Sequence, residues 1–105
     1  MSITVTDNPA ESRYELHTDG RLAAFVVYRL DGNVTDMIHT ETLDGFAGQG
    51  FAGQLVAGAL ADVRRLGRHV RPTCPYVRGY LDKHPDQRDL VPDDLRARLF
   101  GDTPT

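Results

Sequence analysis

The sequence has little of what stabilises secreted proteins and none of the long apolar runs that span membranes. Its 105 residues include one cysteine and no tryptophan, so no disulfide can form within the chain and nothing indicates an oxidising compartment. No apolar run approaches the roughly 20 residues that cross a bilayer. The opening residues, MSITVTD, lack the basic and apolar segments of a signal peptide. We therefore expect one cytoplasmic domain over residues 1–105, without a membrane segment.

Excess positive charge is also missing. The formal net charge is -3, which argues against a dedicated nucleic-acid-binding protein. The basic residues are unevenly placed, however, because one stretch without acidic residues contains Arg64, Arg65, Arg68, Arg71 and Arg78. Two interpretations stay open: a solvated face, or a local site for anionic groups such as phosphates.

The first part of the chain has the pattern of an antiparallel meander. Strands are expected over Tyr14–Thr18, Arg21–Leu30 and Val34–Leu43. Two turn signals, Asp19-Gly20 and Asp31-Gly32, separate these segments.

The pattern changes to helical after Asp44. The segment DGFAGQGFAG leads into apolar residues spaced by three and four: Phe51, Leu55, Val56, Ala59, Leu60, Val63 and Leu66. Gly67 follows, where a left-handed cap would end the helix. Gly53 and Gly58 each cost about 1 kcal/mol inside a helix relative to alanine, which suggests close backbone approach at these positions.

The last part predicts a short strand and further helices. The strand covers Arg68–Thr73, a helix begins at Pro75 and ends at His84-Pro85, and a last helix covers Pro92–Phe100. The helix after Pro75 would bury Tyr76, Val77, Tyr80 and Leu81. A strand–helix–strand connection joins parallel strands. The expected fold is therefore an α/β (α+β) mixed sheet, a meander followed by a β-loop-α-β-α unit.

The glycine-rich loop before the first helix suits a phosphate group, because backbone N–H groups and the helix dipole meet there. No Gly-Lys-Ser/Thr follows the glycines, which excludes a P-loop. Residues 48–53 match G-x-G-x-x-G, but no acidic residue ends the following strand to hold a ribose, so a dinucleotide fold is disfavoured. Coenzyme A pyrophosphate is the third candidate ligand.

Four segments together resemble one known family. The loop Ala47–Ala52 is similar to the GNAT acetyltransferase pyrophosphate loop, Q/R-x-x-G-x-G/A. The segments His39–Thr42 before the loop and Arg71–Val77 after it, with Tyr80-Leu81-x-x-His84-Pro85, resemble the short GNAT-type "N-acetyltransferase domain-containing" proteins. The resemblance implies a minimal GNAT-like fold. Ala47 departs from the usual Gln or Arg, which removes one side-chain contact.

The resemblance implies acetyl-CoA as cofactor and an unidentified amine as acceptor. Backbone amides would bind the pyrophosphate, and the pantetheine arm would lie along the strand before the loop like an added strand. The implied cofactor-binding residues are Thr40, Thr42, Leu43, Ala47, Gly48, Gln49, Gly50, Phe51, Ala52 and Gly53.

Cys74 is the first candidate for the chemistry. It precedes Pro75 at a predicted helix N-terminus, where the helix dipole and nearby arginines lower a thiol pKa. A reactive thiol could accept the acetyl group or form a mixed disulfide with coenzyme A. The alternative is a small buried apolar residue.

Acetyl transfer also needs a base for the amine proton and an acid for the leaving thiolate. The resemblance implies Tyr80 as that acid, with a core aromatic as the alternative. His39 and Glu41 alternate on one strand face, so either could be the base; the alternatives are a structural histidine and a solvated glutamate. A zinc site lacks recognisable ligand spacing, so no metal is expected.

Two functions remain in competition. The first is an acetyl-CoA-dependent N-acetyltransferase, which the ordered motifs favour. The second is a non-catalytic acyl-CoA-binding or regulatory module, which the short chain favours because it leaves no room for helices around an acceptor pocket. We expect a monomer or a weak homodimer.

Overall fold

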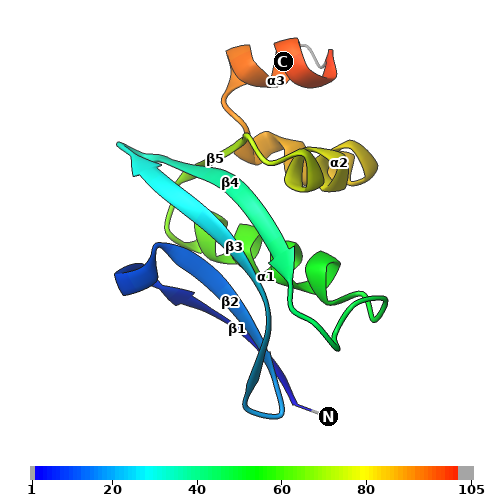
Figure 1. The fold of residues 1–105 in the computed structure, drawn as a ribbon. Coiled ribbons are helices and arrows are strands. Elements are labelled where there is room, and N and C mark those ends of the chain that lie inside the picture. Colours follow the sequence, from blue (N-terminus) through cyan, green and yellow to red (C-terminus); the bar gives the residue numbers. More distant parts are fainter. Residues whose placement is uncertain (1, 102–105) are drawn as a thin grey trace.

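The chain forms one sheet whose strands follow the sequence order. The computed structural model describes residues 2–101. Its strands are β1 (Ile3–Asn8), β2 (Arg13–Thr18), β3 (Arg21–Asp31), β4 (Val34–Thr42) and β5 (His69–Pro72). They lie in the order β1-β2-β3-β4-β5, antiparallel except for the parallel pair β4 and β5 (Figure 1). The predicted mixed sheet is confirmed.

Residues 2–101 form three α-helices, two of which pack against the sheet. They are α1 (Phe51–Arg65), α2 (Pro75–Lys83) and α3 (Asp93–Phe100), with short 3₁₀ segments η1 (Pro9–Glu11) and η2 (Pro85–Leu90). Helix α1 connects β4 to β5 and packs against all five strands, whereas α2 packs against β4 and β5. Helix α3 lies beyond α2 at the same end of the molecule (Figure 1). The predicted β-loop-α-β-α unit is confirmed.

The meander is also confirmed, but one strand precedes it. Strand β1 is missing from the predicted strands, since it offers only Ile3 and Val5 as apolar residues and much of it is exposed. It pairs with β2 and forms the outer edge of the sheet. The second hairpin turn also differs, because Asp31 pairs with Val34 and the turn lies one residue later than predicted.

Helix α1 buries the predicted stripe apart from its last member. Leu66, the C-cap residue just after the helix end at Arg65, is 40% exposed. Gly58 permits the close approach of β1, since a Cβ atom there would lie 2.8 Å from Cβ of Val5. A Cβ atom on Gly53 would have only an ordinary 3.6 Å contact, with the Tyr76 hydroxyl, so close approach is found at one of the two predicted glycines.

Helix α2 buries a narrower stripe than predicted. Val77 and Leu81 are fully buried, but Tyr76 is 45% exposed and Tyr80 is half-buried. Residues four apart share one helix face, so the Val77–Leu81 face meets the sheet while Tyr76 points to the side. The tyrosines of α2 therefore border its surface groove rather than the core.

The arginine-rich stretch does not form one phosphate site. Arg64 pairs with Asp89 at 2.8 Å, Arg65 pairs with Asp62, and Arg71 pairs with carboxylates at the end of β3 and within β4. The two arginines of α1 lie in its last turn, and a helix of 15 residues is about 22 Å long. That length separates them from the glycine loop, so the solvated-face interpretation fits the structure.

Candidate functional site

Within residues 2–101, the edge of β4 that faces β5 has no paired strand over the second half of β4. The parallel pairing with β5 covers only Val34–Met37 and ends at Pro72, where the chain turns away into α2. The N–H of Leu43 donates to the carbonyl of Ala23 on β3. Backbone groups in an antiparallel strand alternate in direction, so those of Thr40 and Thr42 face away from β3, toward the open edge. This edge can accept one further extended chain.

The open edge leads to the N-terminus of α1. The glycine loop follows Leu43. Gly50, with φ 76°, occupies the N-cap position of α1 in a left-handed conformation that favours glycine. No side chain caps the helix. Within residues 2–101, the N–H groups of Phe51, Ala52 and Gly53 have no hydrogen-bond acceptor. These three donors and the positive end of the helix dipole form a site suited to an anion.

A groove of about 610 Å³ starts at these amides and runs between α1 and α2. Gly50 and Gly53 line its α1 side, and Tyr76, Tyr80 and Lys83 line its α2 side. The aromatic walls can stack on a flat ring, and Lys83 adds a cation at the helix end. The groove therefore extends the anion site into a longer pocket.

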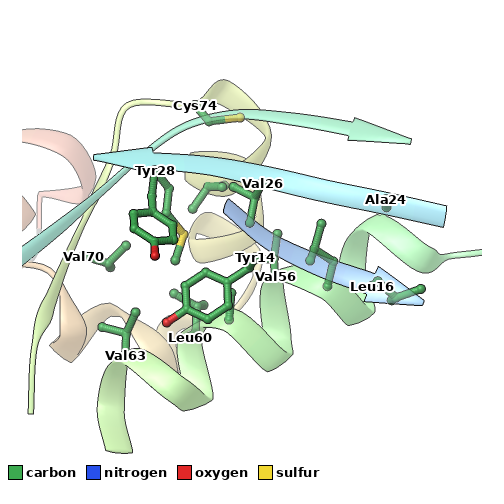
Figure 2. Packing of buried hydrophobic residues seen from close by; sticks show 14 of the residues in the cluster. Tyr14, Leu16, Ala24, Val26, Tyr28, Val56, Leu60, Val63, Val70 and Cys74 are labelled. Carbon is green, nitrogen blue, oxygen red and sulfur yellow. The ribbon is translucent and has the colours of Figure 1, made fainter. Parts of the chain in front are cut away.

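Cys74 lies where β4 and β5 part. Its side chain is 4% exposed, and its Sγ is 3.4 Å from Oγ1 of Thr40. Figure 2 shows Cys74 beside β4, and Cys74 belongs to the same buried cluster as Tyr14. Burial raises the thiol pKa, but the Thr40 hydroxyl and the backbone amides of Val77, Tyr76 and Thr40 outweigh burial and lower the pKa below its ordinary value. The thiol thus combines a buried position with stabilisation of its anion.

Tyr80 lies in the groove rather than against Cys74. Its ring stacks on that of His84, with 3.9 Å between the centroids. Burial, and then the charge of Asp86, raise the pKa of the Tyr80 phenol. The phenol therefore stays protonated at neutral pH, as an acid must. Its assignment as the acid remains a prediction.

His39 and Glu41 share one face of β4, but Thr40 between them points the other way. Nε2 of His39 and Oε1 of Glu41 are 3.2 Å apart, and both side chains are largely exposed. Because Thr40 contacts Cys74, strand alternation places His39 and Glu41 on the face away from the thiol. A base on that face would have to remove the amine proton from across the unpaired edge of β4. Their catalytic role stays a prediction.

A strand irregularity lies beside these residues. Met37 pairs with Tyr28 and His39 pairs with Val27, so Ile38 is the additional residue of a β-bulge. Bulges bend a strand and end regular pairing, and they often lie next to active sites. The bulge coincides with the position at which β4 leaves β5.

Sequence reasoning did not predict a polar cluster at this divergence point. The carboxylate of Asp36, on a residue only 4% exposed, accepts a hydrogen bond from the Thr73 hydroxyl at 2.5 Å. The guanidinium groups of Arg29 and Arg71 each lie 3.6 Å from its other oxygen. An aspartate inside the apolar strand segment V-T-D-M-I is the signal that could have found it.

A second groove lies on the other side of α1, between β1 and the helix C-terminus, with a volume of about 690 Å³. The hydroxyl of Tyr14 donates to Asp62 at 2.7 Å, and the hydroxyl of Tyr28 donates to Asp7 at 2.6 Å. Figure 2 shows both rings between the sheet and α1. Burial and then these hydrogen bonds raise the pKa of both phenols. The sequence did not single out this cluster.

Among residues 2–101, no group of three or more His, Cys, Asp or Glu side chains is arranged to hold a metal ion. None of the helices in that range is long and apolar enough to cross a bilayer.

The glycine loop, the open β4 edge and Cys74 all fall within one family match. The sequence profile of the GCN5-related N-acetyl-transferases matches residues 13–90. The chain belongs to this family. The family segment spans β2 through η2, so β1 and α3 lie outside it.

A solved structure agrees in fold. The solution structure of a GCN5-like candidate N-acetyltransferase from Staphylococcus aureus superposes with a TM-score of 0.64, at 20% sequence identity, over 85% of this chain and 87% of that one. At this identity the match shows a shared fold. A search of curated protein sequences finds no match.

Proposed function

We propose that this protein is an acetyl-CoA-dependent N-acetyltransferase that transfers an acetyl group to an amine. The observation that carries the proposal is the uncapped N-terminus of α1, with free amides at Phe51–Gly53, at the end of a groove between α1 and α2. The unpaired second half of β4 precedes this helix in the chain. Family membership supports the reaction class. The acceptor amine stays open.

The residues present fit acetyl-CoA. The pantetheine amides would pair with the backbone of Thr42 and the carbonyl of Thr40, as an added strand does. The pyrophosphate would bind at the amides of Gly48–Gly53, and the groove beyond them, with Lys83, would hold the remaining part of the nucleotide. Because these contacts use backbone donors, Ala47 in place of a longer polar residue leaves most of the site intact.

When bound, acetyl-CoA supplies a thioester whose carbonyl carbon is open to attack by an amine. The protein then has to remove the amine proton and protonate the departing thiolate. Glu41 or His39 would take the proton from the side of β4 that faces away from Cys74. Tyr80, protonated at neutral pH, would provide the proton for the thiolate.

Cys74 offers a second use of the same site. A thiol with a lowered pKa, 3.4 Å from Thr40 at the open edge, could attack the thioester carbonyl itself. The new bond would join Sγ to the acetyl carbon, the bond to the coenzyme sulfur would break, and the coenzyme thiolate would take up a proton. A mixed disulfide with coenzyme A would need an oxidant.

One observation favours the alternative of a non-catalytic coenzyme A-binding module. His39 and Glu41 are exposed on the sheet face away from Cys74, so the structure does not bring the candidate base and the thiol together. Such a module would bind acetyl-CoA by the same backbone donors without transferring the acetyl group.

Calorimetry with acetyl-CoA and turnover against a broad amine panel test the proposal. Binding with turnover of any amine supports the transferase, and binding without turnover supports the module. If acetyl-CoA at millimolar concentration gives neither heat nor thermal stabilisation, both functions are wrong.

Intact mass spectrometry after incubation with acetyl-CoA tests the role of Cys74. A mass increase of one acetyl group that is lost in Cys74→Ala would show acylation of the thiol. Unchanged transfer by Cys74→Ala would assign the thiol to packing. Glu41→Gln and His39→Gln, both on an exposed face, would separate the two candidate bases by the pH dependence of turnover.

We further propose that residues 1–105 act as one domain in the cytoplasm, as a monomer or weak homodimer. The free thiol of Cys74 fits a reducing compartment. Light scattering at several protein concentrations would determine the oligomeric state.

A further inference from the structure

A polar clasp joins β4 and β5 at the point where they separate. The ladder between the strands ends with Met37 paired to Pro72. Directly beyond it, the N–H of Cys74 donates to the carbonyl of Met37 at 2.8 Å. One residue earlier on each strand, the hydroxyl of Thr73 donates to the carboxylate of Asp36 at 2.5 Å. Asp36 and Met37 of β4 thus bind Thr73 and Cys74, the two residues that follow β5.

The buried position of Asp36 is unfavourable for a carboxylate. It is 4% exposed, and a buried carboxylate is destabilising unless charges and hydrogen bonds compensate for its lost hydration. Its Oδ1 accepts from Thr73, and its Oδ2 faces Arg29 and Arg71, each at 3.6 Å. Three partners from three different strands or loops therefore converge on one carboxylate. Its shortest contact is to Thr73, the residue immediately before Cys74.

The sulfur of Cys74 depends on the placement of this segment. Thr40 contacts Sγ from β4, and the amides of Tyr76 and Val77 face it from the first turn of α2. The contact with Thr40 is a hydrogen bond, whose strength falls steeply with distance and angle. In the part of the chain that the structure describes, no side-chain hydrogen bond caps α2, so the amides act on the thiolate through the positive end of the helix. Cys74 is the N-cap residue of α2, so a shift of its backbone changes all of these contacts together.

We propose that Asp36 is a positioning residue that, through Thr73, holds Cys74 against Thr40 and the amides of α2. The proposal rests on the proposed function, because it gives the thiol a place in that site. Asp36 itself would not touch the thioester or the amine. Its effect would be on the thiolate fraction of Cys74 and on where the open edge of β4 begins.

The test uses a matched pair of substitutions at Thr73. Thr73→Val keeps the side-chain shape and removes the donor, whereas Thr73→Ser keeps the hydroxyl. The thiolate absorbance of the protein, corrected with Cys74→Ala, gives the thiol pKa without relying on access of a reagent. We expect Thr73→Val to raise this pKa by about one unit, which lowers the thiolate fraction near neutral pH about tenfold, and Thr73→Ser to leave it unchanged.

Asp36→Asn gives a second readout that does not require Thr73→Val to fold. Asparagine keeps an acceptor for the Thr73 hydroxyl but loses the charge, and charged hydrogen bonds are roughly twice as strong as neutral ones. We expect a rise in the Cys74 pKa of about half a unit, between Thr73→Ser and Thr73→Val. If Thr73→Val and Asp36→Asn lower the unfolding midpoint but keep the wild-type thiol titration, Asp36 is only structural and the proposal is wrong.

The two proposals can fail separately. Acetyl-CoA binding by the wild-type protein tests the function, and the thiol titrations test the clasp. A protein that does not bind acetyl-CoA but shows the expected order of thiol pKa values would retain the positioning role. If the wild-type protein binds acetyl-CoA but all variants have the same thiol pKa, the positioning role of Asp36 is wrong.

Discussion

Two grooves flank α1, and they differ in how their polar groups are satisfied. The groove toward β1 is lined by Tyr14 and by Asp7, the partner of the buried Tyr28. Each tyrosine hydroxyl has a carboxylate partner, Asp62 or Asp7, within 2.7 Å. The groove toward α2 starts at the amides of Phe51–Gly53, which have no acceptor within residues 2–101. Both grooves are of similar size, about 690 and 610 Å³. Volume alone therefore does not separate a structural cluster from a ligand site.

The comparison teaches that unsatisfied donors are the better indicator. A buried polar group without a partner is destabilising, so folded chains normally pair such groups internally. Beside the first groove, Tyr14 of β2 pairs with Asp62 of α1, and Tyr28 of β3 pairs with Asp7 of β1. The second groove keeps its donors at the surface, where water or a ligand can accept from them. We therefore expect changes in the first groove to alter stability, and changes in the second to alter binding.

Alkaline pH should produce the largest effect, and in the β1 groove. The folded-state pKa values of Tyr14 and Tyr28 lie above the unfolded value of about 10. Stability is therefore complete below pH 10 and is lost as the pH rises above it, at up to about 1.4 kcal/mol per pH unit for each tyrosine. Urea unfolding at pH 11 should show a loss of about 3 kcal/mol relative to pH 8.

Tyr14→Phe should remove about half of this alkaline dependence. Tyr76→Phe is the matched control, because Tyr76 is 45% exposed and lies outside the cluster. If both variants keep the wild-type slope above pH 10, the buried hydrogen bonds do not stabilise the protein in the way described.

Gly58→Ala should have the next largest effect. The added Cβ atom would lie 2.8 Å from Val5, and overpacking of this kind costs typically 1–3 kcal/mol. The helix propensity of alanine returns about 1 kcal/mol, so we expect a net loss of up to about 2 kcal/mol in urea unfolding. Gly53→Ala, whose Cβ has an ordinary 3.6 Å contact, should not be destabilising. Equal stability of the two variants would contradict the close packing of β1.

A third experiment compares the two ends of α1. Gly50 and Gly67 both have positive φ angles, 76° and 68°, so alanine at either site costs about 1 kcal/mol in stability. Only Gly50→Ala changes the backbone next to the free amides. We expect it to weaken acetyl-CoA binding about tenfold, or about 1.4 kcal/mol, and Gly67→Ala to bind as wild type. Calorimetry that finds equal losses would place the ligand elsewhere.

The smallest effect is expected at the arginine-rich stretch. Arg64 and Asp89 form an exposed ion pair, and such pairs contribute about 0–1 kcal/mol. Arg64→Ala should lower stability by less than about 1 kcal/mol and leave acetyl-CoA affinity unchanged at low and high salt. A marked loss of affinity would restore these arginines as part of a phosphate site.

Much of the fold follows from local pattern. The alternation around Tyr14–Thr18 and the spacing from Phe51 to Val63 each match one element of the structure. Strand β1 does not follow in this way, because its pairing depends on β2 and on the contact between Val5 and Gly58. Tyr76 and Leu66 were predicted to be buried but are exposed, since helix periodicity does not say how wide a face the sheet covers.

The candidate site shows the same division. The glycine loop could be read from residues 44–53, because its chemistry is that of the backbone and needs no distant partner. The contact between Cys74 and Thr40 joins residues 34 positions apart, and no local pattern contains it. The same holds for Asp36 and Thr73, and for the separation of His39 and Glu41 from the thiol.

The sequence by itself determined the order of the elements from β2 to α1, the glycine loop before that helix and the position of the thiol at a helix start, since these depend on neighbouring residues and backbone geometry. Only the tertiary structure decided where β4 leaves β5, which donors stay unpaired and which carboxylates are buried. The physical reason is that burial and hydrogen-bond satisfaction belong to surfaces brought together by folding, and their distances are not encoded in spacing along the chain.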